Sequence, residues 1–452
     1  MAAGRCRRLA RRRRGTEAVS DSVDPPRVVR TAGAILLNLN GMVGAGIFAL
    51  PALLYLNIGS FAPVAILLFA LPIACVAAII AKLSTLFERS GGIQLYAETA
   101  LGNFAGFQTG WLIICASTTG RAANFHVLVS YLAALFPLFE GPVARPVTII
   151  ALIAFMTLLG ITGTRRSLGG IWIGTLLKFT PLVLLCLVGF GSNGFPDAIS
   201  LPSFSGMESV ALLIAYAFSG FGASVTAAGE TRDPRTTLFR SVLFAIGGVA
   251  VFYAIVQWAY IAIDPDVGSA DTPLAAAGQK LFGDWGAMMI SIAAVFSIGT
   301  NQLSSFVVMP RILFGMGERR LLPAFFAHVS PRYRTPDHAI LAYAGIVTII
   351  ALSGSFATLL PLLVAVEQAI FLLLLASLFL FWRNNFRGLR DAMGGVWLVI
   401  VPVASAMVLW MSAQIPALAV LSLAGLAVLG AALYWLARRA VAFERPAGAV
   451  AG

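Results

Sequence analysis

Charged residues are scarce in this sequence. They make up 11% of its 452 residues, whereas soluble proteins average about 25%. Hydrophobic residues make up 59%, and the mean hydropathy is +0.90. Several apolar runs are long enough to cross the roughly 30 Å of bilayer hydrocarbon as helices. Because lipid offers no partners to free backbone groups, this composition excludes a soluble multidomain protein and predicts an all-α polytopic membrane protein.

Residues that perform catalysis or bind metals are also few. The sequence has 3 histidines and 4 cysteines, without a CxxC pair or other metal-ligand spacing. His126 and Glu367 are the one histidine and the one acid deep inside the predicted spans. A membrane-embedded enzyme would need paired acids, metal-spaced histidines or a nucleophile with its base. We therefore expect no enzyme, no metal and no cofactor, and we interpret His126 as a hydrogen-bonded buried histidine or, alternatively, a titrating group.

Twelve apolar segments are predicted to cross the membrane. Their ranges are residues 30–56, 62–87, 104–136, 143–163, 168–190, 207–229, 241–263, 284–314, 337–355, 358–382, 393–413 and 415–438. Residues 1–29 contain four consecutive arginines and a Pro-Pro pair, which indicates a disordered, basic tail rather than a cleaved signal peptide. Residues 441–452 form a second tail. The arginine run is either an orientation signal or a contact for anionic lipid.

The distribution of Lys and Arg predicts the orientation. With the N-terminus in the cytoplasm, 27 of the 31 Lys and Arg residues fall on the cytoplasmic side, and Arg145 and Lys280 fall outside. The remaining two, Arg121 and Lys178, lie within spans. This bias supports twelve spans with both termini in the cytoplasm. It also explains the net charge of +12 without a nucleic-acid partner.

Two glycine-rich interruptions occupy matching positions in the first and sixth spans. Residues 40–46 (NGMVGAG) lie in the middle of the first, and residues 219–222 (SGFG) in the middle of the sixth. Each would begin a five-span half, and halves with an odd number of spans are inverted in the membrane. Broken helices at matching places in inverted halves are typical of transporter binding sites. The free N–H groups of a half-helix suit a carboxylate, and free carbonyls suit an ammonium. Close packing of small residues is the alternative interpretation.

Four motifs resemble the amino acid–polyamine–organocation transporter superfamily. They are residues 41–51 (GMVGAGIFALP), 91–111 (GGIQLYAETALGNFAGFQTGW), 218–234 (FSGFGASVTAAGETRDP) and 310–336 (PRILFGMGERRLLPAFFAHVSPRYRTP). The resemblance implies a transporter domain over residues 30–440, with an inverted five-plus-five helix core, broken helices 1 and 6 and two C-terminal helices. Repeat one would span residues 30–190, repeat two residues 207–382, and the added helices residues 393–438.

The resemblance also places a substrate against the two breaks. The residues expected to line this site are Met42, Val43, Gly44, Ala45, Gly46, Tyr216, Phe218, Ser219, Gly220 and Phe221. The substrate carboxylate would meet the amides of residues 44–46. The ammonium would meet carbonyls near residue 42 and near residues 218, 219 and 221. Tyr216 falls where some members have an aromatic gate, and a core aromatic is the alternative.

One position departs from the superfamily pattern. Many members have an acidic residue in the break of helix 6 where this chain has Gly222. The missing negative charge favours neutral over cationic substrates.

Lys178 is one of three ionisable residues besides His126 that lie deep in the predicted spans, and buried charges usually serve function. It resembles a lysine that some members carry where sodium-coupled relatives of the fold bind sodium. A protonatable amine beside the first break can replace that ion, which predicts proton coupling or exchange without sodium. A fixed ammonium that ties the fifth span to broken carbonyls is the alternative.

Arg121 and Glu367 are the other two ionisable residues deep in the predicted spans. Arg121 shares a helix face with Ser117 and Asn124, so we expect it to point into the bundle. At 1.5 Å per residue, Arg121 lies roughly 25 Å and Glu367 roughly 22 Å from the cytoplasmic side, whereas Lys178 lies roughly 15 Å deep. These depths predict that Arg121 and Glu367 approach each other, directly or through water, beside the substrate. Alternatively, Arg121 is free to bind an acidic substrate.

These patterns predict a secondary active amino acid transporter of the cytoplasmic membrane that works by alternating access. Its partners would be a small-molecule amino acid and membrane lipid. The alternatives are a transporter of a related small amine or acidic amino acid, and an amino acid sensor that does not transport.

Overall fold

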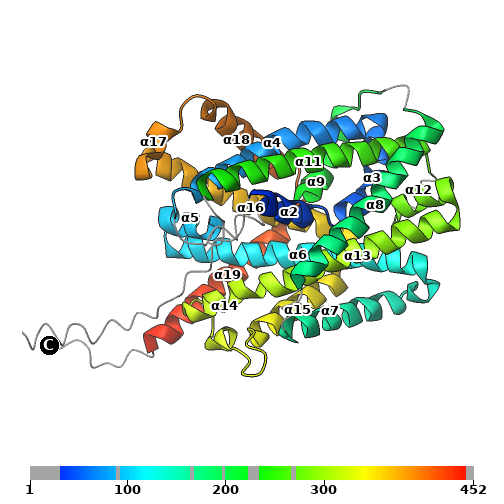
Figure 1. Ribbon diagram of the computed structural model, residues 1–452. Helices are drawn as coiled ribbons and strands as arrows, with labels where there is room; N and C mark the ends of the chain where they lie inside the picture. The colour runs from blue at the N-terminus through cyan, green and yellow to red at the C-terminus, as the bar shows by residue number, and fades with distance from the viewer. Residues whose placement is uncertain are drawn as a thin grey trace, which may run out of the picture.

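A computed structural model describes residues 31–87, 92–162, 167–195, 199–221, 234–265 and 271–443, and these residues form helices and connecting loops without a strand (Figure 1). The α-helices are α2 (Thr31–Met42), α3 (Gly46–Ile58), α4 (Ala62–Ser84), α5 (Gly92–Leu101), α6 (Asn103–Leu135), α7 (Ala144–Thr162), α8 (Ser167–Asn193), α9 (Phe204–Phe218), α11 (Pro234–Ile263), α12 (Pro273–Phe282), α13 (Asp284–Val308), α14 (Pro310–Glu318), α15 (Asp337–Ser353), α16 (Phe356–Arg383), α17 (Leu389–Ala392), α18 (Trp397–Ala413) and α19 (Ala417–Phe443). Short 3-10 turns are η1 (Gly59–Phe61), η2 (Pro137–Phe139), η5 (Ala324–Ala327) and η6 (Phe386–Gly388).

Helices occupy all or part of each range predicted from hydropathy. By length and composition, seven helices in the described residues can cross a membrane. The number is eight if Phe386–Ala392 and Trp397–Ala413, which are bent by 105° relative to each other, count as one span. The polytopic, all-helical class is therefore supported, whereas twelve crossings and the inverted repeat stay predictions. The predicted eighth span divides into α13 and α14 at Pro310, and residues 222–229 of the predicted sixth span lie outside the described residues.

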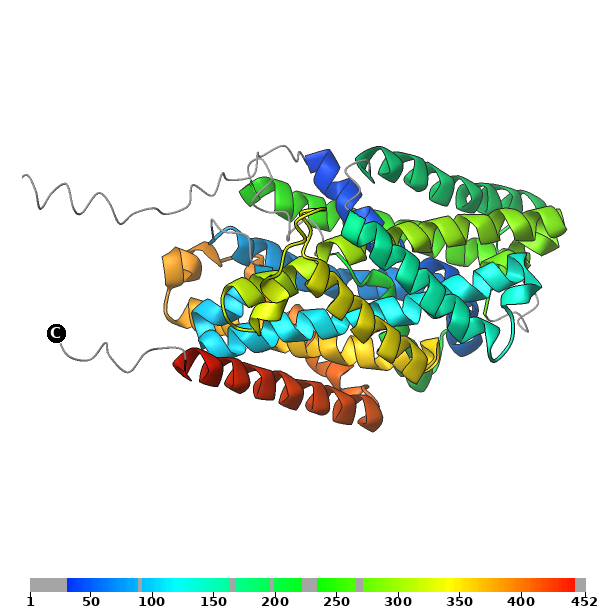
Figure 2. The same cartoon turned by 90° about the horizontal axis from the view of Figure 1, so that it is seen from below.

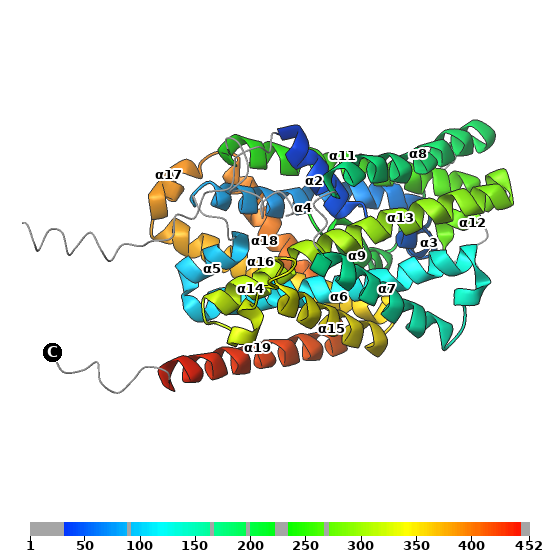
Figure 3. The same ribbon diagram turned by 60° about the horizontal axis from the view of Figure 1, so that its bottom comes forward.

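Helix α6 is the centre of the bundle. It packs against α5, α13, α15, α16 and α19, and it crosses the middle of the molecule in two views (Figures 1 and 3). Helix α19 lies along one edge (Figure 2) and exposes apolar side chains such as Leu421 and Val428, as expected for a surface that faces lipid. The interior around α6 is thus shielded from lipid and available for polar groups.

The first span is interrupted where the sequence predicts. Helix α2 ends at Met42 and α3 begins at Gly46, with Val43, Gly44 and Ala45 between them outside either helix. Two glycines in this stretch lower helix propensity, and the Gly44 N–H turns back to the Met42 carbonyl at 2.8 Å. The interruption creates a buried pair of helix ends in the middle of the bundle.

Helix α9 also ends inside the bundle. Ser219 leaves the helical conformation with ψ 141°, and Gly220 adopts φ 97°, in the left-handed region that favours glycine. Phe221 is the last described residue before residue 234. Gly222, the position that departs from the superfamily pattern, lies outside the described residues.

Candidate functional site

The ends of α2 and α9 touch each other through glycine. A Cβ atom on Gly220 would lie 2.6 Å from the Gly41 carbonyl oxygen, and one on Gly46 would lie 3.1 Å from the Ala217 Cα atom. Gly46 therefore faces the backbone of α9. This contact agrees with close helix packing, the alternative interpretation, and the substrate contact of Gly46 stays a prediction.

The beginning of α3 presents uncapped backbone donors. Ala45 is the N-cap residue and offers no capping side chain. In the described part of the chain, no acceptor is bonded to the N–H groups of Ala45, Gly46 or Ile47, although all three residues are buried. Buried N–H groups are nearly always paired. Three unpaired donors at a helix N-terminus form a site for an anionic group.

Lys178 of α8 binds the end of α2. Its ammonium donates to the Val43 carbonyl at 2.7 Å and to the Asn40 side-chain oxygen at 3.0 Å, and the side chain is 1% exposed. The position next to the first break agrees with the resemblance. The contacts serve a fixed ammonium as well as a proton carrier, so the coupling role stays a prediction.

Asn301 of α13 connects Arg121 with the same end of α2. Its amide nitrogen donates to the Asn40 carbonyl at 2.8 Å, and its side-chain oxygen accepts a hydrogen bond from the Arg121 guanidinium. Gln302 donates to the Arg121 carbonyl at 2.9 Å. Asn301 was not among the predicted residues, although the polar sequence Thr300-Asn301-Gln302 inside an apolar span was a signal for it.

The carbonyl of Met42 has a protein donor. The Tyr253 hydroxyl of α11 donates to it at 3.0 Å, and the Phe218 and Tyr253 rings lie 5.9 Å apart. Tyr253 was also missed. An ammonium at Met42 would share this carbonyl with Tyr253, so any ammonium contact depends more on the end of α9.

Tyr216 is held on two sides. Its hydroxyl donates to the Asn124 side-chain oxygen of α6 at 2.5 Å, and its ring meets the Phe356 ring edge-on at 5.4 Å. These contacts place Tyr216 between α6 and α16. They suit a gate that hydrogen-bonds when closed as well as a core aromatic.

Arg121 and Glu367, which were predicted to approach each other directly or through water, do not form a direct ion pair. Glu367 accepts a hydrogen bond from the Ser219 hydroxyl at 2.8 Å, whereas Arg121 binds Asn301. The ion pairs among the described residues do not join the two, although their charges interact at longer range. The depth in the membrane fixes only one of three coordinates. Asn301 is the nearer partner of Arg121, and Ser219 is the nearer partner of Glu367. Contact through water stays a prediction.

His126 and Phe221 are predicted residues whose contacts remain to be described. The His126 ring nitrogen lies 2.9 Å from the Ala351 carbonyl oxygen, as expected for a hydrogen-bonded histidine. Phe221 stacks on Phe371 of α16 at 6.1 Å between ring centroids.

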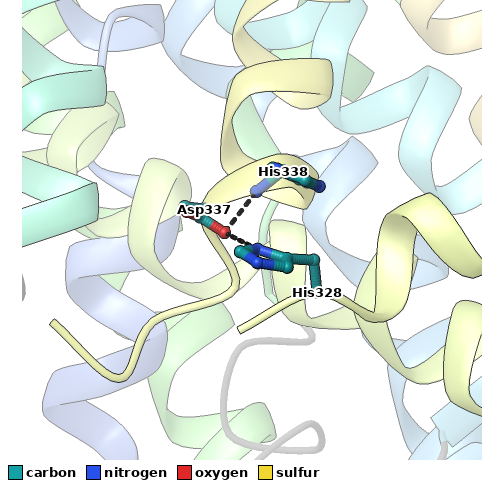
Figure 4. A group of neighbouring side chains, drawn as sticks. All are labelled: His328, Asp337 and His338. Atoms are coloured by element: carbon teal, nitrogen blue, oxygen red, sulfur yellow. Dashed lines mark hydrogen bonds and ion pairs between the residues drawn. The ribbon is translucent and has the colours of Figure 1, made fainter. Parts of the chain in front are cut away.

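A second polar cluster lies between η5 and the start of α15 (Figure 4). Ligand atoms of His328, Asp337 and His338 lie within 4.8 Å of one another, which is close enough to consider a metal. However, His328 and Asp337 form an ion pair at 2.7 Å, and the two imidazole rings stack at 4.0 Å and 18°. Nearly parallel rings direct their lone pairs alongside each other rather than to one point. The arrangement thus fits an ion pair with stacking, and the expected lack of a metal site stays a prediction.

Comparison with known proteins identifies related transporters. The family model described as amino acid permease matches residues 30–436. The chain is 28% identical to the serine/threonine exchanger SteT of Bacillus subtilis, over 68% of this chain and 72% of the relative. It is 26% identical to the branched-chain amino acid permease BcaP of Bacillus subtilis, over 72% and 73%. It is also 26% identical to a cadaverine/lysine antiporter of Escherichia coli, over 58% and 60%.

Proposed function

Because the chain belongs to the amino acid permease family of the amino acid–polyamine–organocation superfamily, we propose that it carries neutral amino acids across the cytoplasmic membrane by alternating access. The family and the apolar helices make it an integral membrane transporter rather than an enzyme. We propose twelve crossings with both termini in the cytoplasm, and transport by proton coupling or exchange without sodium. The alternatives are a transporter of a related small amine or acidic amino acid and a sensor that does not transport. The experiment below distinguishes them.

The uncapped start of α3 is the observation that carries this proposal. The N–H groups of residues 45–47 provide donors for a carboxylate, at the end of a helix whose dipole favours negative charge. The end of α9 lies next to it, since Gly46 contacts Ala217. A zwitterion can therefore place its carboxylate on α3 and its ammonium near the carbonyls of α9.

Charge balance disfavours a cationic substrate. The relatives carry different substrates by name: branched-chain amino acids, serine and threonine, or cadaverine and lysine. Near the breaks, the described residues include two cations, Arg121 and Lys178, and one carboxylate, Glu367. A cationic substrate would add to a positive excess in a medium of low dielectric constant, which costs free energy.

Lys178 provides a means of proton coupling. Its ammonium holds the Val43 carbonyl and the Asn40 side chain together. Loss of the proton removes one donor and the charge, which loosens the end of α2. A cation already present at the first break also explains why sodium would not be required.

The proposal is tested by counterflow in proteoliposomes. The purified protein is reconstituted with each of the twenty amino acids inside, and uptake of the labelled amino acid is measured with and without sodium and with and without a pH gradient. Sodium-independent uptake of neutral amino acids is expected. Binding without uptake would favour a sensor, and uptake only of amines or acidic amino acids would replace the substrate class.

Ala45→Pro tests the carboxylate site with a small change. Proline removes the N–H group of residue 45, and the φ of −71° at Ala45 already suits proline. A lost hydrogen bond to a charged group costs about 1.5–3 kcal/mol, so we expect affinity for the amino acid to fall at least about tenfold. Ala45→Ser keeps the N–H group and is the control. Equal affinities of the two variants in calorimetric titration would remove this amide from the site.

A further inference from the structure

Arg121 is only partly satisfied in the interior of the bundle. One of its terminal nitrogens donates to Asn301, but its Nε atom is sealed from solvent and has no hydrogen-bond partner. A guanidinium has five N–H donors, and unpaired donors in a buried site are costly. The side chain as a whole is half-buried, so it reaches space that a ligand or water can occupy.

Glu367 is also partly satisfied. One carboxylate oxygen accepts from Ser219, and no hydrogen bond to the other oxygen occurs among the described residues. Like Arg121, Glu367 and Ser219 are half-buried, although their helices α16 and α9 pack against each other and α16 packs against α6. The described residues therefore do not enclose the Glu367 side chain completely.

The two incomplete groups are connected to different helix ends at the breaks. Arg121 is connected through Asn301 to the end of α2, and Glu367 is connected through Ser219 to the end of α9. Their charges interact, but they are too far apart for an ion pair. A group between them would have to accept hydrogen bonds from the guanidinium and donate one to the carboxylate.

We propose that Arg121 and Glu367 form the subsite for the side chain of the substrate, and that this subsite selects an uncharged group that both accepts and donates hydrogen bonds. Hydroxyl and carboxamide groups have this chemistry, which assigns serine, threonine, asparagine and glutamine as the preferred class. A second ammonium can donate to Glu367 but cannot accept from Arg121, and a second carboxylate can accept from Arg121 but cannot donate to Glu367. An aliphatic side chain would leave both groups unpaired, which discriminates strongly against it. This inference rests on the proposed amino acid transport.

Glu367→Gln tests the subsite because it turns the accepting carboxylate into a group that can also donate a hydrogen bond. The glutamine amide keeps the size of the side chain but can donate a hydrogen bond and has no charge. In counterflow competition, the unaltered protein should prefer serine, threonine, asparagine or glutamine over leucine, lysine and glutamate by at least about tenfold. In the Glu367→Gln variant, the affinity for glutamate relative to glutamine should rise at least about tenfold.

Glu98→Gln is the matched control, because it makes the same chemical change outside the subsite. Glu98 lies on α5 and pairs with Arg319 near the surface. Its selectivity should equal that of the unaltered protein. Preferred transport of leucine or lysine by the unaltered protein would overturn the subsite and leave amino acid transport intact. An unchanged selectivity in a folded Glu367→Gln protein would do the same. If that variant does not fold, competition on the unaltered protein decides alone. Absence of any amino acid uptake or binding would refute the underlying function.

Discussion

Lys178→Ala should reduce uptake at least about a hundredfold, or leave a slow uptake that no longer depends on external pH. The side chain is 1% exposed and holds both the Val43 carbonyl and the Asn40 side chain. Its removal takes a charged donor away from these acceptors, at about 1–3 kcal/mol each, and removes the group proposed to exchange a proton. Uptake into proteoliposomes over a series of external pH values measures the effect. Thermal shift with substrate reports whether binding survives.

Lys280→Ala is the control for the loss of a lysine. Lys280 is exposed and donates to the Asp264 carbonyl, away from the breaks. This variant should keep both the rate and the pH profile. Full activity with an unchanged pH profile in Lys178→Ala would eliminate the proton role, and sodium-dependent uptake by the unaltered protein would argue against it independently.

Gly220→Ala should separate the ends of α2 and α9 and abolish most transport. The φ of 97° is unfavourable for a residue with a Cβ atom, and that atom would lie 2.6 Å from the Gly41 carbonyl oxygen. Backbone strain of about 1–3 kcal/mol adds to a clash of similar size, so we expect a fall in Tm as well as in uptake. Thermal unfolding and counterflow on the same preparation measure both effects.

Gly345→Ala provides the comparison. Gly345 lies inside α15, and a Cβ atom there would meet nothing within 4 Å. Alanine in a helix interior is favoured over glycine by about 0.5–1 kcal/mol, so this variant should be neutral or slightly more stable. A Gly220→Ala protein with the same Tm and uptake as Gly345→Ala would contradict the contact between the two breaks.

The helices and the first interruption could be predicted because they depend on local properties of the chain. Apolar length located the spans, and the cluster at Gly41, Gly44 and Gly46 located the break between α2 and α3. Pro310 also divides a helix locally, but the predicted span ran through it to residue 314. The number of crossings and the inverted repeat depend on arrangement in the membrane, so they are still predictions.

The partners within the site could not be predicted because they depend on distant segments. Asn301 and Tyr253 reach the end of α2 from more than two hundred residues away in sequence. Residue counting gave Arg121 and Glu367 similar depths but could not show that Arg121 binds Asn301 and that Glu367 binds Ser219. Lys178 contacts the Val43 carbonyl and the Asn40 side chain beside the first break, and its coupling role stays a prediction.

We expect the start of α3 and the end of α9 to bind the two charged ends of one amino acid. This binding is tested most directly by calorimetric titration of the purified protein with three ligands: the amino acid that competes best in counterflow, its decarboxylated amine and its N-acetyl derivative. Only the intact amino acid should bind, because each derivative lacks one of the two charges. Binding of the decarboxylated amine as tightly as the amino acid would contradict the carboxylate site on α3.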